Sequence, residues 1–96
     1  MTVSAPYPNP VVAGQTVKLM LSANPNCPKK VMVAVYSAAY RKIYGSTISV
    51  ANERGIWEWP VVDSKGAPVA SGVYYLRVEE EGVGTVLKWS PVVVLR

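Results

Sequence analysis

Apolar and polar residues alternate along several short stretches of this chain, with the period of two that places successive side chains on opposite faces of a β-strand. Valine or leucine fills every second position of residues 16–22, and valine does so in residues 30–37. Residues 73–79 repeat the pattern, with Tyr74 and Leu76 on one face. The pattern predicts strands at residues 16–22, 30–37, 41–44, 47–50, 56–62, 73–79 and 85–95.

Turn-forming residues separate these stretches. Asp63 and Gly66 stand at the first and fourth positions of a predicted type I turn, where the Asp63 carboxylate can accept a hydrogen bond from the backbone two residues on. Gly72 frees the backbone just before a strand begins. Gly45 is expected to break the chain between two short strands.

Prolines restrict two further segments. Three prolines within residues 6–10 require an extended chain that lies at a sheet edge, because proline cannot donate to a continuous ladder. Pro91 falls inside the last predicted strand, so a bulge or an edge is expected there.

No window of eleven residues sustains a helical apolar period, and a single helical turn at residues 37–42 is the weakest alternative. We therefore predict one all-β domain over residues 1–96, an antiparallel sandwich of immunoglobulin or fibronectin III type with about seven strands. Trp57 and Trp59 share one face of their strand, and Tyr74 is placed to form a tyrosine corner. The structural core and turns are thus expected to depend on Trp59, Asp63, Gly66, Gly72 and Tyr74.

Composition and charge narrow the functional classes. The ten basic and six acidic residues give a net charge of +4, and the basic residues are scattered, which argues against nucleic-acid binding. No apolar run approaches the roughly 20 residues of a membrane helix, so we expect no membrane insertion. The opening residues show no signal peptide, so for an exported protein we expect that the signal was either trimmed away or carried by a larger parent protein. The single Cys27 can form no internal disulfide, which favours a bacterial module.

The chemistry of catalysis is missing from the sequence. There is no histidine, and Cys27 has no general base near it in the sequence. Residues 79–81 are three consecutive glutamates, but neighbouring strand residues alternate faces, so a solvated hairpin tip is favoured over a cation site. Turn capping likewise explains Asp63 better than calcium binding does. We expect no cofactor, no metal and no enzymatic activity.

Several motifs, taken in order, resemble the immunoglobulin-like (FlgD-like) domain of the flagellar hook-capping protein and the C-terminal sorting modules of type IX secretion. They are Tyr7-Pro8-Asn9-Pro10, the strand Val31 to Tyr36, Arg41-Lys42-Ile43, the trio Trp59, Asp63 and Gly66, the segment Val69 to Tyr74, and the apolar closing strand Val92 to Leu95.

Four positions depart from the family pattern. Tyr40 stands where the family usually has glycine, so we expect the turn there to differ. Ser37 replaces the usual aspartate, and Pro60-Val61 replaces the usual Asp-Gly.

The resemblance implies a non-catalytic C-terminal domain of a larger bacterial protein that is secreted or held at the cell surface. Its partner would be a protein, either secretion machinery or a neighbouring domain. Strand addition to an exposed edge is one available mode of docking, and the expected edges are residues 85–95 or residues 47–50.

Two alternatives remain open. The chain has six tyrosines and three tryptophans, ring types that sugar-binding and protein-binding surfaces use. The candidate surface consists of Tyr36, Tyr44, Tyr75 and Trp89, with Tyr40 as a further exposed ring. A carbohydrate-binding module is the first alternative, and a self-assembling structural domain, as in hook capping, is the second.

Overall fold

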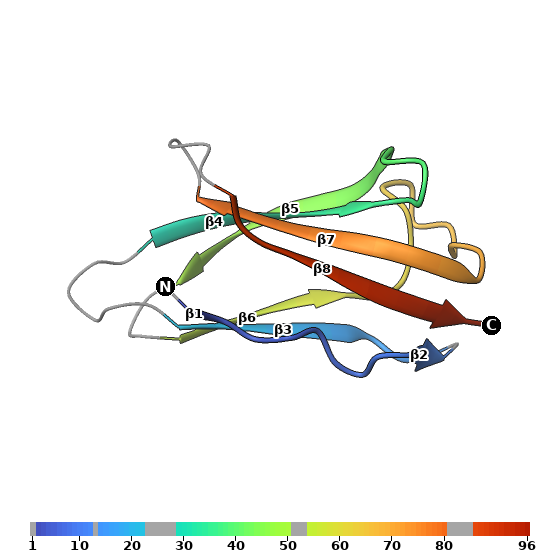
Figure 1. Cartoon of the computed structure of the whole chain (residues 1–96), viewed down its shortest axis with the longest axis horizontal. Coiled ribbons are helices and arrows are strands. Elements are labelled where there is room, and N and C mark those ends of the chain that lie inside the picture. The colour runs from blue at the N-terminus through green and yellow to red at the C-terminus, as the bar shows by residue number, and fades with distance from the viewer. Residues whose placement is uncertain (1, 13, 23–28, 51–53, 81–85) are drawn as a thin grey trace.

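The computed structural model describes residues 2–12, 14–22, 29–50, 54–80 and 86–96. Within them the chain forms eight β-strands and no helix (Figure 1). The strands are β1 (Thr2–Val3), β2 (Val11–Val12), β3 (Val17–Ser22), β4 (Lys29–Tyr36), β5 (Lys42–Val50), β6 (Arg54–Trp59), β7 (Gly72–Glu80) and β8 (Val86–Leu95).

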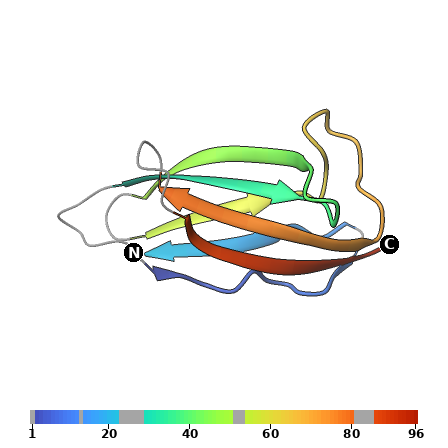
Figure 2. The same ribbon diagram turned by 45° about the horizontal axis from the view of Figure 1, so that its top comes forward.

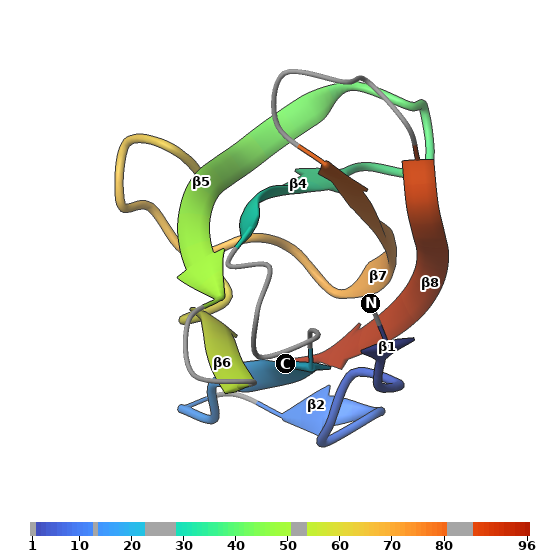
Figure 3. The same cartoon turned by 90° about the vertical axis from the view of Figure 1, so that its left-hand side faces the viewer.

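The strands form two sheets packed face to face. One sheet has the order β1-β3-β6 and the other has the order β2-β8-β7-β4-β5. Figures 2 and 3 show that the five-stranded sheet curls around the three-stranded one. This arrangement confirms the predicted all-β sandwich.

The proline-rich N-terminal segment passes from one sheet to the other. β1 pairs antiparallel with β3, whereas β2 pairs parallel with β8 at the far end of the molecule. Both strands lie at sheet edges and have only two residues each, because the intervening prolines cannot supply a continuous ladder. The predicted edge position of this segment is therefore confirmed.

The two short strands predicted at residues 41–44 and 47–50 are one continuous strand, β5. Gly45 does not break it, since Gly45 pairs with Ala34 in the ladder with β4. The irregularity comes earlier, in a register shift between Val35 and Tyr36. The helical turn considered at residues 37–42 is instead the hairpin turn between β4 and β5, where the Tyr40 N–H donates to the Ser37 carbonyl at 2.8 Å.

The strand predicted at residues 56–62 ends earlier, at Trp59. Pro60 follows immediately and has no N–H to continue the ladder. Val62 then makes only an isolated bridge to Pro68.

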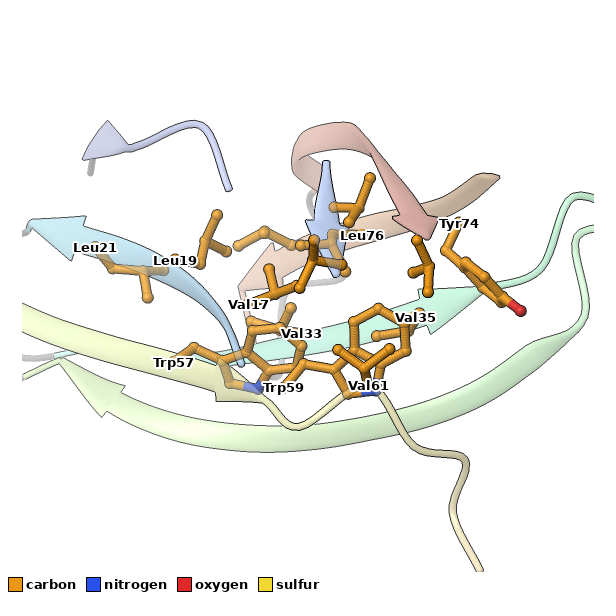
Figure 4. Close-up of a cluster of buried hydrophobic side chains, with 14 of the residues drawn as sticks. Val17, Leu19, Leu21, Val33, Val35, Trp57, Trp59, Val61, Tyr74 and Leu76 are labelled. Atoms are coloured by element: carbon orange, nitrogen blue, oxygen red, sulfur yellow. The ribbon is translucent and has the colours of Figure 1, made fainter. Parts of the chain in front are cut away.

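The core lies between the inward faces of the two sheets (Figure 4). Trp59 is fully buried and its indole Nε1 donates to the Val62 carbonyl at 2.7 Å. The Trp57 Nε1 donates to the Ser46 hydroxyl of β5 at 2.7 Å, which links the two sheets. Both indoles therefore bury their apolar surface while their N–H groups are satisfied.

The predicted tyrosine corner is present. The Tyr74 ring packs edge-on against the Trp59 ring, with centroids 5.7 Å apart, and its hydroxyl donates to the Ala70 carbonyl at 2.7 Å. The bond ties the start of β7 to the backbone four residues upstream. Burial raises the pKa of the Tyr74 phenol, and the nearby Arg96 charge opposes that rise.

The predicted turn at Asp63 is also present. The Gly66 N–H donates to the Asp63 carbonyl at 3.0 Å, and the Asp63 carboxylate accepts from the N–H groups of Lys65 and Ala67. Gly66 has φ of 84°, a left-handed conformation that glycine adopts without steric cost. The carboxylate thus caps the turn, as its position in the sequence predicted.

Candidate functional site

Three of the four candidate rings lie together on the outer face of the five-stranded sheet. β7 turns Tyr74, Leu76 and Val78 into the core, so Tyr75 and Arg77 face outward. The ladder then pairs Tyr75 with Tyr36 of β4 and Arg77 with Trp89 of β8. Residues from three strands that are distant in the sequence thereby share one surface.

The rings form two contacting pairs. Tyr36 and Trp89 have centroids 5.4 Å apart at an interplanar angle of 48°, and Tyr40 stacks on Tyr75 at 5.7 Å and 15°. Tyr40 is 69% exposed and Trp89 is 46% exposed, while Tyr36 and Tyr75 are half-buried. We call Tyr36, Tyr40, Tyr75 and Trp89 the aromatic patch.

An arginine borders the aromatic patch. The Arg77 guanidinium carbon lies 5.7 Å from the centre of the Trp89 ring, within the range of a cation–π contact. One of its terminal nitrogens pairs with the Glu79 carboxylate at 3.1 Å. The patch therefore combines exposed aromatic surface with an oriented cation.

Tyr40 occupies the patch in an unfavourable backbone conformation. Its φ is 58°, a left-handed value that costs a residue with a Cβ about 1–2 kcal/mol. The surrounding turn has the same hydrogen bonds as the turn at Asp63, and Tyr40 stands where Gly66 stands in that second turn. The expectation that the turn would differ is therefore wrong, since the positive φ is kept and a tyrosine adopts it.

The structure separates Tyr44 from the other candidate rings. Tyr44 projects from β5 toward the interior, where it lies 6.2 Å from the Trp57 ring and 6.5 Å from the Trp59 ring. It is half-buried and packs against the core. A register shift separates the pair Tyr36–Lys42 from the pair Val35–Tyr44. Because such a shift interrupts the alternation of faces, the sequence pattern alone does not give the face on which Tyr44 lies.

The edge of β8 is largely occupied. The Asn9 side chain acts as a substitute strand, with Nδ2 donating to the Pro91 carbonyl at 3.0 Å and Oδ1 accepting from the Val93 N–H at 3.0 Å. β2 pairs with the two residues that follow. Pro91 thus lies in an edge segment. An edge was one of the two settings predicted for it, and a bulge was the other.

The described ranges show neither a metal-binding cluster nor a membrane-spanning helix. Residues 2–12, 14–22, 29–50, 54–80 and 86–96 contain no group of three histidine, cysteine, aspartate or glutamate residues that could hold a metal ion. Cys27 and Glu81 lie outside those ranges. In the same ranges no helix is long and apolar enough to cross a membrane.

Comparison with known proteins gave matches to solved structures. No protein-family model matches the sequence, and no curated protein does. The chain is similar to part of dimeric latent PorU from Porphyromonas gingivalis, with 20% identity, a TM-score of 0.78 and 94% of this chain covered. It is also similar to part of PorZ, an essential bacterial surface component of the type IX secretion system of the same organism, with 22% identity, a TM-score of 0.66 and 99% covered.

A third similar structure is FlgD from P. aeruginosa, with 20% identity, a TM-score of 0.65 and 88% of this chain covered. The matched regions make up 9% of the PorU chain, 11% of the PorZ chain and 64% of the FlgD chain, so this chain spans less than two thirds of each. At these identities the likeness shows the fold. It confirms the FlgD-like immunoglobulin-like architecture that the sequence motifs implied.

Proposed function

We propose that this chain is a non-catalytic docking module, carried at the C-terminal end of a larger bacterial protein that is secreted or attached to the cell surface. The module would bind a protein partner, either secretion machinery or a neighbouring domain. The fold it shares with regions of PorZ and FlgD supports a role of this class.

The aromatic patch is the observation that carries the proposal. Protein-binding surfaces are enriched in tyrosine, tryptophan and arginine, and a few such residues at the centre of an interface supply most of its binding energy. Here Tyr36, Tyr40, Tyr75 and Trp89 lie together beside Arg77 on one sheet face. Strands hold Tyr36, Tyr75 and Trp89, and Tyr40 stacks on Tyr75 from the adjoining turn, so little entropy would be lost when the rings bind.

The conformation of Tyr40 supports a role other than stability. A stacked aromatic pair contributes about 0.5–1.5 kcal/mol, which roughly cancels the cost of the left-handed backbone. The ring is also 69% exposed, so it adds little to the core. Backbone strain of this kind is concentrated at functional sites.

A reporter fusion tests the proposal. The chain is fused to the C-terminus of a reporter enzyme and expressed in a bacterium with type IX secretion, and reporter activity is measured on intact cells and in the medium. We expect export of the wild-type fusion and loss of most of that export in the double variant Tyr40→Ala/Trp89→Ala. Ile56→Ala is the matched control, because Ile56 is 51% exposed on the outer face of the other sheet.

Retention of the wild-type fusion inside the cell would contradict the proposal, as would equal export of the patch variant and the control.

Each of the two alternative functions predicts a different experimental result. Binding to a glycan array that disappears in Tyr75→Ala or Trp89→Ala would indicate a carbohydrate-binding module. A stable dimer or ring in sedimentation of the isolated chain would indicate a self-assembling domain.

A further inference from the structure

The five-stranded sheet ends on one side in a long strand with an open edge. β5 is the terminal strand of the order β2-β8-β7-β4-β5, and among the described residues it forms a ladder with β4 alone (Figure 3). The Ile43 carbonyl points away from β4, because it accepts the Ser64 N–H at 2.8 Å. Pro91 and Val93 of β8 turn their backbone groups away from β7 toward Asn9. The regular registers from β8 through β7 and β4 to β5 carry this alternation across the sheet, so the backbone groups of Gly45, Thr47 and Ser49 point away from β4.

Between Gly45 and Ser49 the edge of β5 has little protection against strand pairing. Its two ends are covered, since the Ser64 N–H bonds to the Ile43 carbonyl next to a register shift, and Gly55 of β6 lies beside Val50. Natural edges are protected by charged residues, prolines, bulges or covering segments. The edge of β8 has Pro91 and is covered by Asn9 and β2. Residues 43–50 contain no charged residue and no proline, and their outer-face positions are glycine, threonine and serine.

A pocket adjoins the open edge at its N-terminal end. It has a volume of about 280 Å³ and is lined by Lys42, Ile43, Tyr44, Gly45 and Ser64. Ile43 and Tyr44 supply apolar surface there. A space of this size beside an exposed strand can receive one large apolar side chain of a polypeptide that pairs with the strand.

The side chain of Lys42 lies beside the same pocket. A Cβ at Gly45 would lie 2.9 Å from Cε and 3.4 Å from Nζ of Lys42, so the lysine side chain lies over the glycine. Within the described residues no carboxylate is within 4.0 Å of the Lys42 ammonium. Glycine keeps this part of the edge free of side-chain bulk and leaves a positive charge beside it.

We propose that the β5 edge binds an extended segment of a partner protein, which pairs with Gly45, Thr47 and Ser49, inserts one large apolar side chain into the adjoining pocket and places a carboxylate near Lys42. This site is separate from the aromatic patch and adds a second contact to the proposed docking function. Main-chain hydrogen bonds would supply affinity, and the pocket and the lysine would supply selectivity.

Charge complementarity favours such a segment over a second copy of this chain. Residues 41–50 contain Arg41 and Lys42 and no acidic residue. A parallel pair of β5 strands would place two copies of Lys42 side by side, with no compensating carboxylate in either strand. An acidic partner segment would instead meet the lysine with opposite charge.

The probe is a random dodecapeptide library displayed on phage and selected against the immobilised wild-type chain. We expect enriched peptides that contain a large apolar residue close to an aspartate or glutamate. The tightest of them, as a synthetic labelled peptide, should shift the amide NMR signals of residues 43–49.

Three variants then test the geometry by fluorescence anisotropy. Thr47→Pro removes one outward N–H without removing a bond to β4, and should weaken binding at least about tenfold. Thr47→Val keeps the N–H and should bind as the wild type does. Lys42→Glu changes an exposed side chain and should weaken binding and reduce its salt dependence. Circular dichroism checks that each variant is folded, and Lys42→Glu decides the question if Thr47→Pro does not fold.

Four results would overturn the inference. One is the absence of any enriched peptide. Another is binding that Trp89→Ala abolishes but Thr47→Pro and Lys42→Glu leave unchanged, which would place the peptide on the aromatic patch. The third is enrichment of basic rather than acidic peptides, and the fourth is a wild-type dimer that Thr47→Pro dissociates. The reporter export that tests the docking function is measured separately with the aromatic-patch variants, so either proposal can fail alone.

Discussion

The Arg96 guanidinium donates to the carbonyl of Val61, with Nη2 3.2 Å from the oxygen, and its Nε donates to the Val69 carbonyl. Val61 is a buried β-branched residue with φ of 62°, which is a rare conformation for such a residue. The two carbonyls belong to the segment that connects β6 to β7. One side chain at the end of β8 thus holds that connection against the sandwich.

Replacing Arg96 by methionine should lower the free energy of unfolding by about 1–3 kcal/mol, because two carbonyls lose a charged donor. Urea unfolding followed by tryptophan fluorescence measures the change. Lys65→Met is the control, since Lys65 is an exposed cation in the Asp63 turn. An equal effect of the two substitutions would show that the guanidinium contacts do not stabilise the connection.

Replacing Trp59 by alanine should cost about 3–5 kcal/mol, the usual loss when a buried aromatic side chain leaves a cavity. Trp59 is fully buried, whereas Trp89 is 46% exposed, so Trp89→Ala should cost less than about 1.5 kcal/mol. Thermal unfolding of both variants makes the comparison. A loss below about 1 kcal/mol in Trp59→Ala would mean that this indole lies outside the core.

Replacing Tyr74 by phenylalanine removes the hydrogen bond to Ala70 and should cost about 1 kcal/mol near neutral pH. Because burial raises the Tyr74 pKa in the folded state above its ordinary value of 10.0, the unfolded state loses the proton first as the pH rises. The contribution of Tyr74 to stability is therefore present below pH 10 and is lost as the pH rises through the folded-state pKa.

Urea unfolding of Tyr74→Phe at a series of pH values checks this dependence. The stability of the variant should fall less than that of the wild type above pH 10. Parallel curves for the two proteins would exclude Tyr74 as the source of alkaline destabilisation.

Replacing Tyr40 by glycine should leave the stability unchanged or raise it by up to about 1 kcal/mol, since relief of the left-handed backbone offsets the loss of stacking on Tyr75. Tyr40→Ala keeps the strain and loses the ring, so it should be less stable than both Tyr40→Gly and the wild type. Thermal melts of the three proteins give the order. If the alanine variant equals the glycine variant, the positive φ imposes no cost.

Local features of the sequence predicted most of the fold. The alternation of apolar residues predicted β3, β4, β7 and β8 to within a residue or two. The turn at Asp63 and the corner at Tyr74 followed from residue types that act within four positions of each other. Gly45 was misplaced as a strand break, because a ladder with β4 can hold a glycine whose own propensity opposes a strand.

Backbone conformation at two positions could not be inferred from residue type. Tyr40 and Val61 both stand where the family pattern usually has glycine, and both keep positive φ. Neighbouring contacts compensate for the cost, through stacking on Tyr75 in one case and the bond from Arg96 in the other. Propensity predicts against such a conformation unless the compensating partner, far away in the sequence, is known.

The sequence by itself determined which residues alternate between core and surface, and therefore the all-β class and the buried position of Trp59. Only the tertiary structure decided that Tyr36, Tyr75 and Trp89 share one outer face, that Tyr44 turns toward the core, and that β5 rather than β8 has the open edge. The physical reason is one of range. Alternation is a property of neighbouring residues, whereas surface neighbours and free edges depend on strand order and register, which are set by pairing between distant segments.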